Sequence, residues 1–128
     1  MLGALLQRLF SGFGSKPNGG DAAGNAAIRA QLAAMGDDGT APRHVLHYVY
    51  PHRKSAAVPR EEIAAFLAEQ GFDTVRDAAN DGGFVMEHER EVASAAFDEF
   101  TSDLAATLST KGWEYDGWEC AVVTEEQD

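Results

Sequence analysis

Apolar side chains recur at every third or fourth position in the first 13 residues, which would place them on one face of a helix. Gly3 and Gly12 weaken that helix, and an isolated helix of this length is marginal in water, so it needs a surface to lie against. Its own domain is the simplest such surface; a partner groove and a weak contact with a membrane surface are the alternatives. The apolar positions are Leu2, Leu5, Leu6, Leu9, Phe10 and Phe13.

A segment rich in glycine, serine and asparagine follows at Ser11–Gly24 and predicts a flexible linker. The chain is therefore divided into an amphipathic N-terminal arm with its linker, residues 1–24, and one domain, residues 25–128. Asn25 is expected to cap a helix over Ala26–Met35 at the start of that domain.

Four strands and two helices are expected after this helix. Runs of β-branched and aromatic residues predict strands, and helical periodicity between them predicts helices. The expected elements are strand His44–Tyr50, a helix that begins at Pro59 and is stopped by Gly71, strands Phe72–Ala78 and Phe84–Glu89, a helix over Glu91–Lys111 and strand Trp113–Val123.

This β-α-β-β-α-β order is the split βαβ arrangement of a ferredoxin-like sandwich. The fold class is therefore α+β, with a four-stranded antiparallel sheet, both core helices on one face and an extra N-terminal helix. The other sheet face is left open. Phe84 and Met86 alternate with Val85 and Glu87 in the third strand, so Phe84 and Met86 are assigned to the core.

Charge narrows the class of partner. The chain has 21 acidic and 10 basic residues and a net charge of −11. Residues 1–60 hold 7 basic and 3 acidic groups, whereas residues 61–128 hold 3 basic and 18 acidic groups. Such a field repels nucleic acid, so the expected partner is a protein, and specifically a basic one.

Cysteine content and hydropathy indicate where the protein works. Cys120 is the only cysteine, so no internal disulfide can form, and a cytoplasmic location is expected. No apolar run approaches the ~20 residues that span a bilayer. Met1–Phe13 does not have the pattern of a secretory signal, because no basic residues precede its apolar stretch.

Metal chemistry is poorly supported. His88-Glu89 lacks the second histidine of the H-E-x-x-H motif. His44 and His47 are three apart in a strand and point to opposite faces. His47 and His88 could meet across strands, but two imidazoles without another placed ligand make a weak site. Surface or half-buried histidines are the simpler interpretation.

Other catalytic and nucleotide-binding motifs are also missing. Cys120 lies in an expected strand, where a small buried hydrophobe is the usual identity. Gly12–Lys16 lacks the spacing of a phosphate-binding loop. An alignment of Phe84-Val85 with an RNA-recognition motif leaves the stacking aromatics absent. No catalytic, cofactor-binding or metal-binding residue is therefore assigned, and direct nucleic-acid binding is not expected.

Tyr115-Asp116-Gly117-Trp118, in the last strand, is the most distinctive sequence. Strands rarely tolerate Asp-Gly, so the pair predicts a bulge or a change of face between two large aromatic anchors. Two interpretations stay open, a packed aromatic corner and a corner that contacts a partner. On the second, the candidate partner-binding residues are Tyr115, Asp116, Trp118 and Glu119.

This tetrapeptide, following a long helix and Gly112, resembles the family called regulator of ribonuclease E activity B. The resemblance covers roughly Asn25–Val123 and includes the element order and Gly71-Phe72 before the second strand. It implies a ferredoxin-like fold and a non-enzymatic regulator that binds ribonuclease E and inhibits its RNA cleavage. An acidic protein suits docking on basic segments of such a nuclease.

Two alternative functions remain. One is an unrelated protein-interaction or dimerisation module, in which the arm mediates formation of a homo-oligomer. The other is a small-molecule-binding or catalytic ferredoxin-like domain, which would need a pocket with converging polar groups on the open sheet face.

Overall fold

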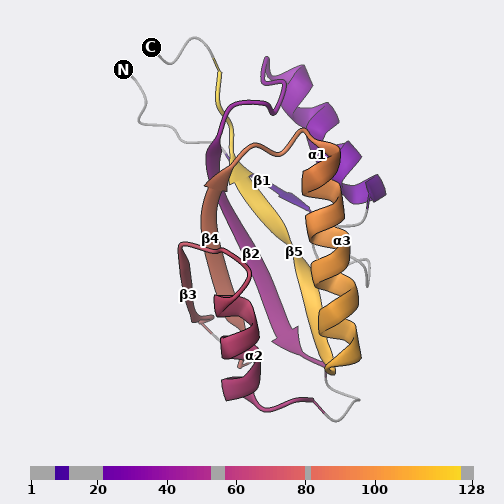
Figure 1. Ribbon diagram of the computed structural model, residues 1–128. Coiled ribbons are helices and arrows are strands. Elements are labelled where there is room, and N and C mark those ends of the chain that lie inside the picture. Colours follow the sequence, from indigo (N-terminus) through magenta and orange to yellow (C-terminus); the bar gives the residue numbers. More distant parts are fainter. Residues whose placement is uncertain (1–7, 12–21, 53–56, 80–81, 125–128) are drawn as a thin grey trace.

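The computed structural model describes residues 8–11, 22–52, 57–79 and 82–124. These residues form an α+β structure in which helices lie along one side of an antiparallel sheet (Figure 1). The elements, in chain order, are β1 (Arg8–Ser11), α1 (Ala22–Ala34), β2 (Arg43–Pro51), α2 (Arg60–Ala68), β3 (Thr74–Asp77), β4 (Phe84–Arg90), α3 (Ala95–Thr110) and β5 (Trp113–Ala121).

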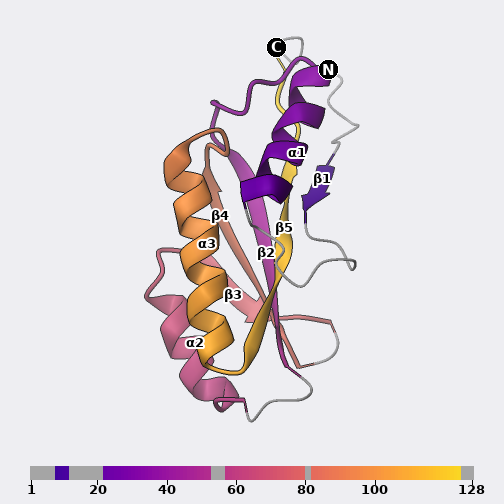
Figure 2. The ribbon, with the colours of Figure 1, turned by 90° about the vertical axis from the view of Figure 1, so that its right-hand side faces the viewer.

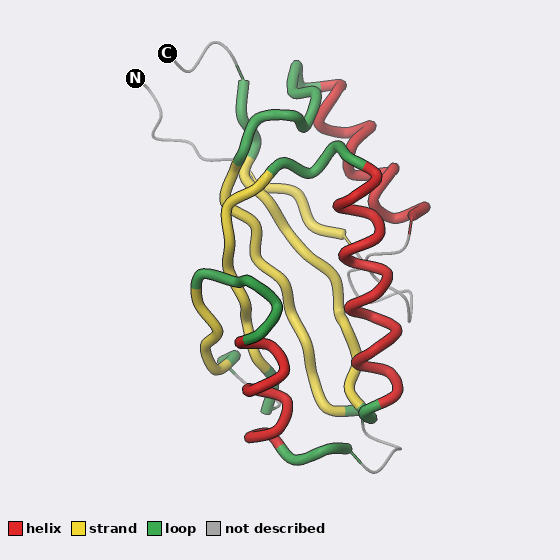
Figure 3. Tube along the Cα trace, viewed as in Figure 1, coloured by secondary structure: helices red, strands yellow, loops and turns green. Residues whose placement is uncertain are grey.

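The sheet has five strands in the order β1-β5-β2-β4-β3, and every neighbouring pair is antiparallel. The four strands expected from the sequence are all present, and β2 is the central strand of the five. Seen from the side, α1, α2 and α3 all lie in front of the same sheet face (Figure 2). The tube trace shows the same separation into a helical layer and a strand layer (Figure 3). We call the opposite surface the helix-free face.

The core lies between these two layers. Val45, Val49 and Met86 contribute from the sheet, and Leu67 and Leu108 contribute from the helices; all five are fully buried. Alternation along β2 is regular from Arg43 to Tyr50, where the odd-numbered residues are buried and the even-numbered residues are partly exposed. The assignment of Phe84 and Met86 to the core is confirmed.

Helix α3 begins at Ala95, four residues later than the sequence pattern predicts. Its N-cap is Ser94, whose side chain accepts a hydrogen bond from the backbone N–H of Phe97. The Glu91 carboxylate accepts hydrogen bonds from the backbone N–H groups of Ala93 and Ser94, each at 3.0 Å. Glu91 therefore stabilises the turn before the helix and is not part of the helix itself.

The predicted amphipathic helix of the arm is wrong for the residues that the structure describes there. Arg8–Ser11 forms β1, which pairs with β5 from Arg8 opposite Ala121 to Ser11 opposite Trp118. The backbone of a sheet edge offers ready hydrogen bonds, whereas a short helix containing glycines gains little on its own. The rest of the arm, residues 1–7 and 12–21, lies outside the described residues.

Helix α1 begins at Ala22, so Asn25 lies inside the helix and is not its cap, contrary to the sequence interpretation. The Asn25 side chain is fully buried, and its contacts with α3 and β5 explain why a polar residue occupies this position. The helix ends at Ala34, one residue before the expected end at Met35, and Gly36 adopts a φ of 88° after the last turn. The division of the chain at residue 24 stays a prediction.

Candidate functional site

The Asp-Gly step of β5 forms a bulge, as the sequence predicts. Tyr48 of β2 lies opposite Gly117, but the next residue, Val49, lies opposite Tyr115, so Asp116 is the extra residue. Gly117 has a φ of 108°, a backbone conformation that residues with a Cβ rarely adopt. The bulge therefore needs glycine at this position.

The bulge changes which side chains of β5 face the helices. In a regular strand, Tyr115 and Trp118 would point to opposite faces, because they are three residues apart. With one extra residue between them, both point into the core and both are buried. The indole of Trp118 packs edge-on against Phe97 of α3, with ring centroids 4.8 Å apart. The two aromatic residues thus form a packed internal corner.

The other two predicted partner-binding residues lie on the helix-free face. Asp116 and Glu119 are partly exposed in β5. The Tyr48 hydroxyl donates a hydrogen bond of 2.8 Å to Glu119 Oε1. Partial burial raises the pKa of Asp116, and the charge of Glu114 on the same face adds to the effect. The structure thus places the four predicted residues in two pairs, on opposite faces of the sheet.

Sequence reasoning missed the residues of β2 that complete this surface. The even-numbered residues Leu46, Tyr48 and Tyr50 alternate with the buried ones and lie between β4 and β5. The ring of Tyr50 lies against Gly83, where a Cβ would collide with the tyrosine ring and with the Val49 carbonyl oxygen. The alternation in VLHYVY was the available signal, but the pattern alone does not show which face carries the helices.

Carboxylates surround these β2 residues on both sides. On β4, Glu87 accepts hydrogen bonds from His44 at 2.8 Å and from Arg76 at 2.9 Å, and these two contacts lower its pKa. On β5, Glu114 is the partly exposed residue opposite Tyr50. The acidic and aromatic patch of the helix-free face consists of Leu46, Tyr48, Tyr50, Glu87, Glu114, Asp116 and Glu119.

A buried hydrogen-bonded chain of two histidines and a tyrosine crosses the core. His47 Nδ1 lies 2.7 Å from the Tyr115 hydroxyl, and His47 Nε2 lies 2.9 Å from His88 Nε2. Burial lowers the pKa of both imidazoles, to about 4 for His88, so both are neutral near pH 7. Rings of Phe72 and Phe100 pack around them.

These histidines do meet across the strands, as their positions suggested, but they bond to each other. Among the described residues, no group of three or more His, Cys, Asp or Glu side chains could hold a metal ion. Cys120 is fully buried, as expected for a small hydrophobe in a strand. His47 and Cys120 are thus fully enclosed in the core, and His88 is 8% exposed.

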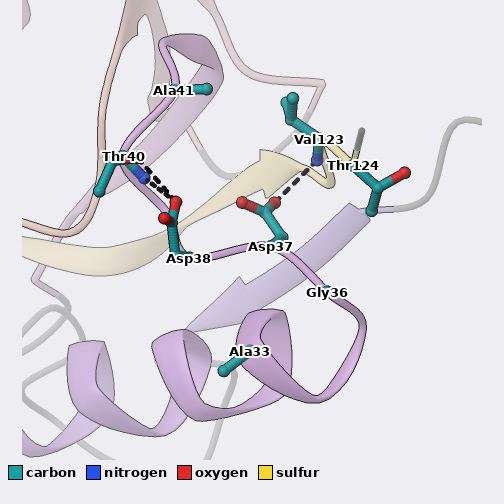
Figure 4. A pocket seen from close by; sticks show the side chains of 8 residues that line it. All are labelled: Ala33, Gly36, Asp37, Asp38, Thr40, Ala41, Val123 and Thr124. Carbon is teal, nitrogen blue, oxygen red and sulfur yellow. Dashed lines mark hydrogen bonds between the residues drawn. The ribbon is translucent and has the colours of Figure 1, made fainter. Parts of the chain in front are cut away.

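A pocket of about 480 Å³ lies at the C-terminal end of α1, beside the segment that follows β5 (Figure 4). Both carboxylates that line it, Asp37 and Asp38, accept hydrogen bonds from neighbouring residues of the chain. Asp37 accepts hydrogen bonds from the Arg43 guanidinium and from the backbone N–H groups of Gly39 and Val123. Asp38 accepts two hydrogen bonds from Thr40. Through these contacts the pocket wall connects the end of α1 with β2 and with the segment that follows β5.

None of the helices described here has the length and apolar character needed to span a membrane. No curated protein and no solved structure gives a significant match to the chain. A family model does match, over residues 22–120, which includes every described helix and strand except β1 and the last residue of β5. The resemblance seen in the Tyr115-Asp116-Gly117-Trp118 corner and the element order is thereby confirmed. The chain belongs to the family described as Regulator of ribonuclease activity B.

Proposed function

We propose that this protein binds ribonuclease E through protein–protein contacts and inhibits its cleavage of RNA, without catalysing a reaction itself. Membership of a family of regulators of ribonuclease activity supports the regulatory role. The observation that carries the proposal of direct binding is the acidic and aromatic patch on the helix-free face. The three described helices all lie on the other side of the sheet (Figure 2).

Charge complementarity supports a basic segment of the nuclease as the contact. A ribonuclease needs basic surface to bind RNA phosphates, and the acidic patch is suited to occupy such a surface in competition with RNA. The net charge of −11 favours the encounter over long distances at low ionic strength. The single buried cysteine is compatible with a cytoplasmic location, which we include in the proposal.

The four residues singled out in the sequence have two roles in this proposal. Asp116 and Glu119 are the contact residues, because their carboxylates lie on the helix-free face. Tyr115 and Trp118 are positioning residues, because their buried rings fix the bulge that presents the two carboxylates. The strand order β5-β2-β4-β3 supports the ferredoxin-like classification of the domain.

Association and cleavage measured together test the proposal. Purified full-length chain is titrated into ribonuclease E, and binding is followed by calorimetry while cleavage of a fluorescent single-stranded RNA is followed in parallel. We expect a saturable complex and a cleavage rate that falls as the complex forms. Binding with no effect on cleavage would overturn inhibition, and absence of both would overturn the whole proposal.

A control separates direct inhibition from capture of the RNA. The same titration is performed with a labelled RNA and no nuclease. We expect no RNA binding at physiological salt, because the acidic field repels phosphates. If the chain retained the RNA, loss of cleavage would reflect substrate sequestration, and inhibition through protein contacts would be excluded.

A further inference from the structure

We propose that the acidic and aromatic patch binds an extended protein segment that carries arginine side chains at alternate positions. This inference rests on the proposed function and names the chemistry of the partner at that site. Three features of the patch lead to it: the pairing of rings with carboxylates, the glycines beside the rings, and the spacing along β2.

Each tyrosine of the patch is paired with a carboxylate from β5. Tyr48 donates its hydroxyl hydrogen bond to Glu119 at 2.8 Å, and Tyr50 lies directly opposite Glu114 in the register. Asp116, the bulged residue, lies between these two pairs along β5. The patch thus repeats a flat aromatic ring next to a negative charge.

Glycines lie beside both rings, and both tyrosines are partly exposed. Tyr48 lies opposite Gly117 on β5 and Val85 on β4, and the ring of Tyr50 packs against Gly83. A guanidinium can stack on a tyrosine ring while it donates parallel hydrogen bonds to a carboxylate. An ammonium lacks the planar fork, so the pairing favours arginine over lysine.

The spacing of the two tyrosines along β2 favours arginines at alternate positions of the bound segment. Tyr48 and Tyr50 are two residues apart in a strand, which places their Cα atoms about 6.7 Å apart. Arginines separated by one residue in an extended segment have the same spacing and point in the same direction. A segment lying along β2 would therefore place successive arginines over successive ring and carboxylate pairs.

Electrostatics at Asp116 favours the same occupant. Among the residues that the structure describes, no cation forms an ion pair with Asp116, and Glu114 is a further negative charge on that face. A guanidinium placed between them would relieve this repulsion. RNA is disfavoured here, because its phosphates would meet the same carboxylates.

Synthetic peptides test the inference with the full-length chain. One peptide carries three arginines at alternate positions, a second has lysines in the same positions, and a third has the three arginines in consecutive positions. Affinity is measured by calorimetry at about 0.15 M salt. We expect the alternate-arginine peptide to bind at least about tenfold more tightly than either of the others.

A matched pair of variants locates the binding surface. D116N/E119Q removes two charges from the patch, and E99Q/D103N removes two charges from exposed positions of α3. Binding of the alternate-arginine peptide should fall about tenfold in the first variant and stay unchanged in the second. Amide shifts of the wild-type chain on peptide addition should concentrate in β2 and β5, and urea unfolding checks that both variants fold.

The results distinguish this inference from the proposed function. Equal affinities for the three peptides, equal losses in the two variants, or amide shifts confined to the helices would overturn the inference. If ribonuclease E still bound the chain in that case, the proposed function would stand with a different contact surface. Failure of ribonuclease E to bind at all would overturn the proposed function, whatever the peptides show.

Discussion

The indole Nε1 of Trp118 donates a hydrogen bond of 2.8 Å to the side-chain oxygen of Asn25, and both side chains are fully buried. The amide nitrogen of Asn25 in turn donates to Thr101 Oγ1 at 3.0 Å and to Asp98 Oδ1 at 2.8 Å. One side chain thus joins α1 to both β5 and α3. This junction depends on the bulge, because only the bulge turns Trp118 toward the helices.

Replacing Asn25 should therefore destabilise the domain strongly. N25A removes three hydrogen bonds and leaves the indole N–H buried without an acceptor, so we expect the free energy of unfolding to fall by about 2–4 kcal/mol. Urea denaturation followed by tryptophan fluorescence measures it. The control is A26S, an exposed position of the same helix, which should change stability by less than about 0.5 kcal/mol. Equal effects of the two substitutions would contradict the role given to Asn25.

Replacing Gly117 should also destabilise the domain, because of its backbone conformation. G117A places a Cβ on a residue with a φ of 108°, and we expect a loss of about 1–3 kcal/mol in the free energy of unfolding. E114A, at a partly exposed position of the same strand, is the control and should cost less than about 0.5 kcal/mol. If G117A were as stable as the wild type, the bulge would not require glycine.

Gly117 and Asn25 show which features could be predicted from the sequence and which could not. The Asp-Gly step predicted a bulge because its residue types are rare inside strands, and the bulge is present. The sequence could not show which face Trp118 takes, since that depends on the partner strand's register. Asn25 was misassigned as a cap because an asparagine before an apolar pattern is a good local cap signal. Its hydrogen-bond partners are 73 to 93 positions away, beyond any local pattern.

The pair of Asp37 and Arg43 gives a third prediction. Their side chains are 2% and 0% exposed, whereas the Asp77 and Arg60 pair is 77% and 43% exposed. D37N leaves the Arg43 charge buried without its counter-ion, so we expect stability to fall by about 3–5 kcal/mol. D77N should change it by less than about 1 kcal/mol. Guanidinium chloride would screen these charges, so urea is the denaturant. Similar losses in both variants would show that burial does not determine how much an ion pair contributes to the free energy of unfolding.

The buried histidines predict a loss of stability in mild acid. The pKa of His88 is lowered to about 4 in the folded protein by burial and by the positive charge of Arg90, and burial also lowers the pKa of His47. The unfolded chain, with histidine pKa values of about 6.5, therefore binds more protons as the pH falls from about 6.5 toward 4. Stability contributed by neutral histidine is present above this window and is lost within it.

The size of this effect follows from His88 alone. Between pH 7 and pH 5, its pKa shift corresponds to a fall of about 2 kcal/mol in the free energy of unfolding. Urea denaturation at the two pH values measures the fall. H88L should show a shallower dependence of stability on pH than the wild type. A wild-type stability that is the same at both pH values would contradict the neutral buried state.

The N-terminal arm and the helix-free face show two other features that the sequence did not predict. An amphipathic helical pattern predicted a helix across positions 8–11, but the edge of β5 offers that backbone hydrogen bonds as a strand. On the face, Asp116 and Glu119 were singled out through the nearby motif, whereas Tyr48 and Tyr50 were counted only as strand formers. Register alone brings these four residues together.

The affinity of ribonuclease E for two variants with equal charge tests the central claim most directly. D116N/E119Q alters the acidic and aromatic patch, and E99Q/D103N makes the same chemical changes on α3. We predict that the dissociation constant rises at least about tenfold for the first variant and stays at the wild-type value for the second. Equal dissociation constants for the wild type and both variants would show that the helix-free face does not bind the nuclease.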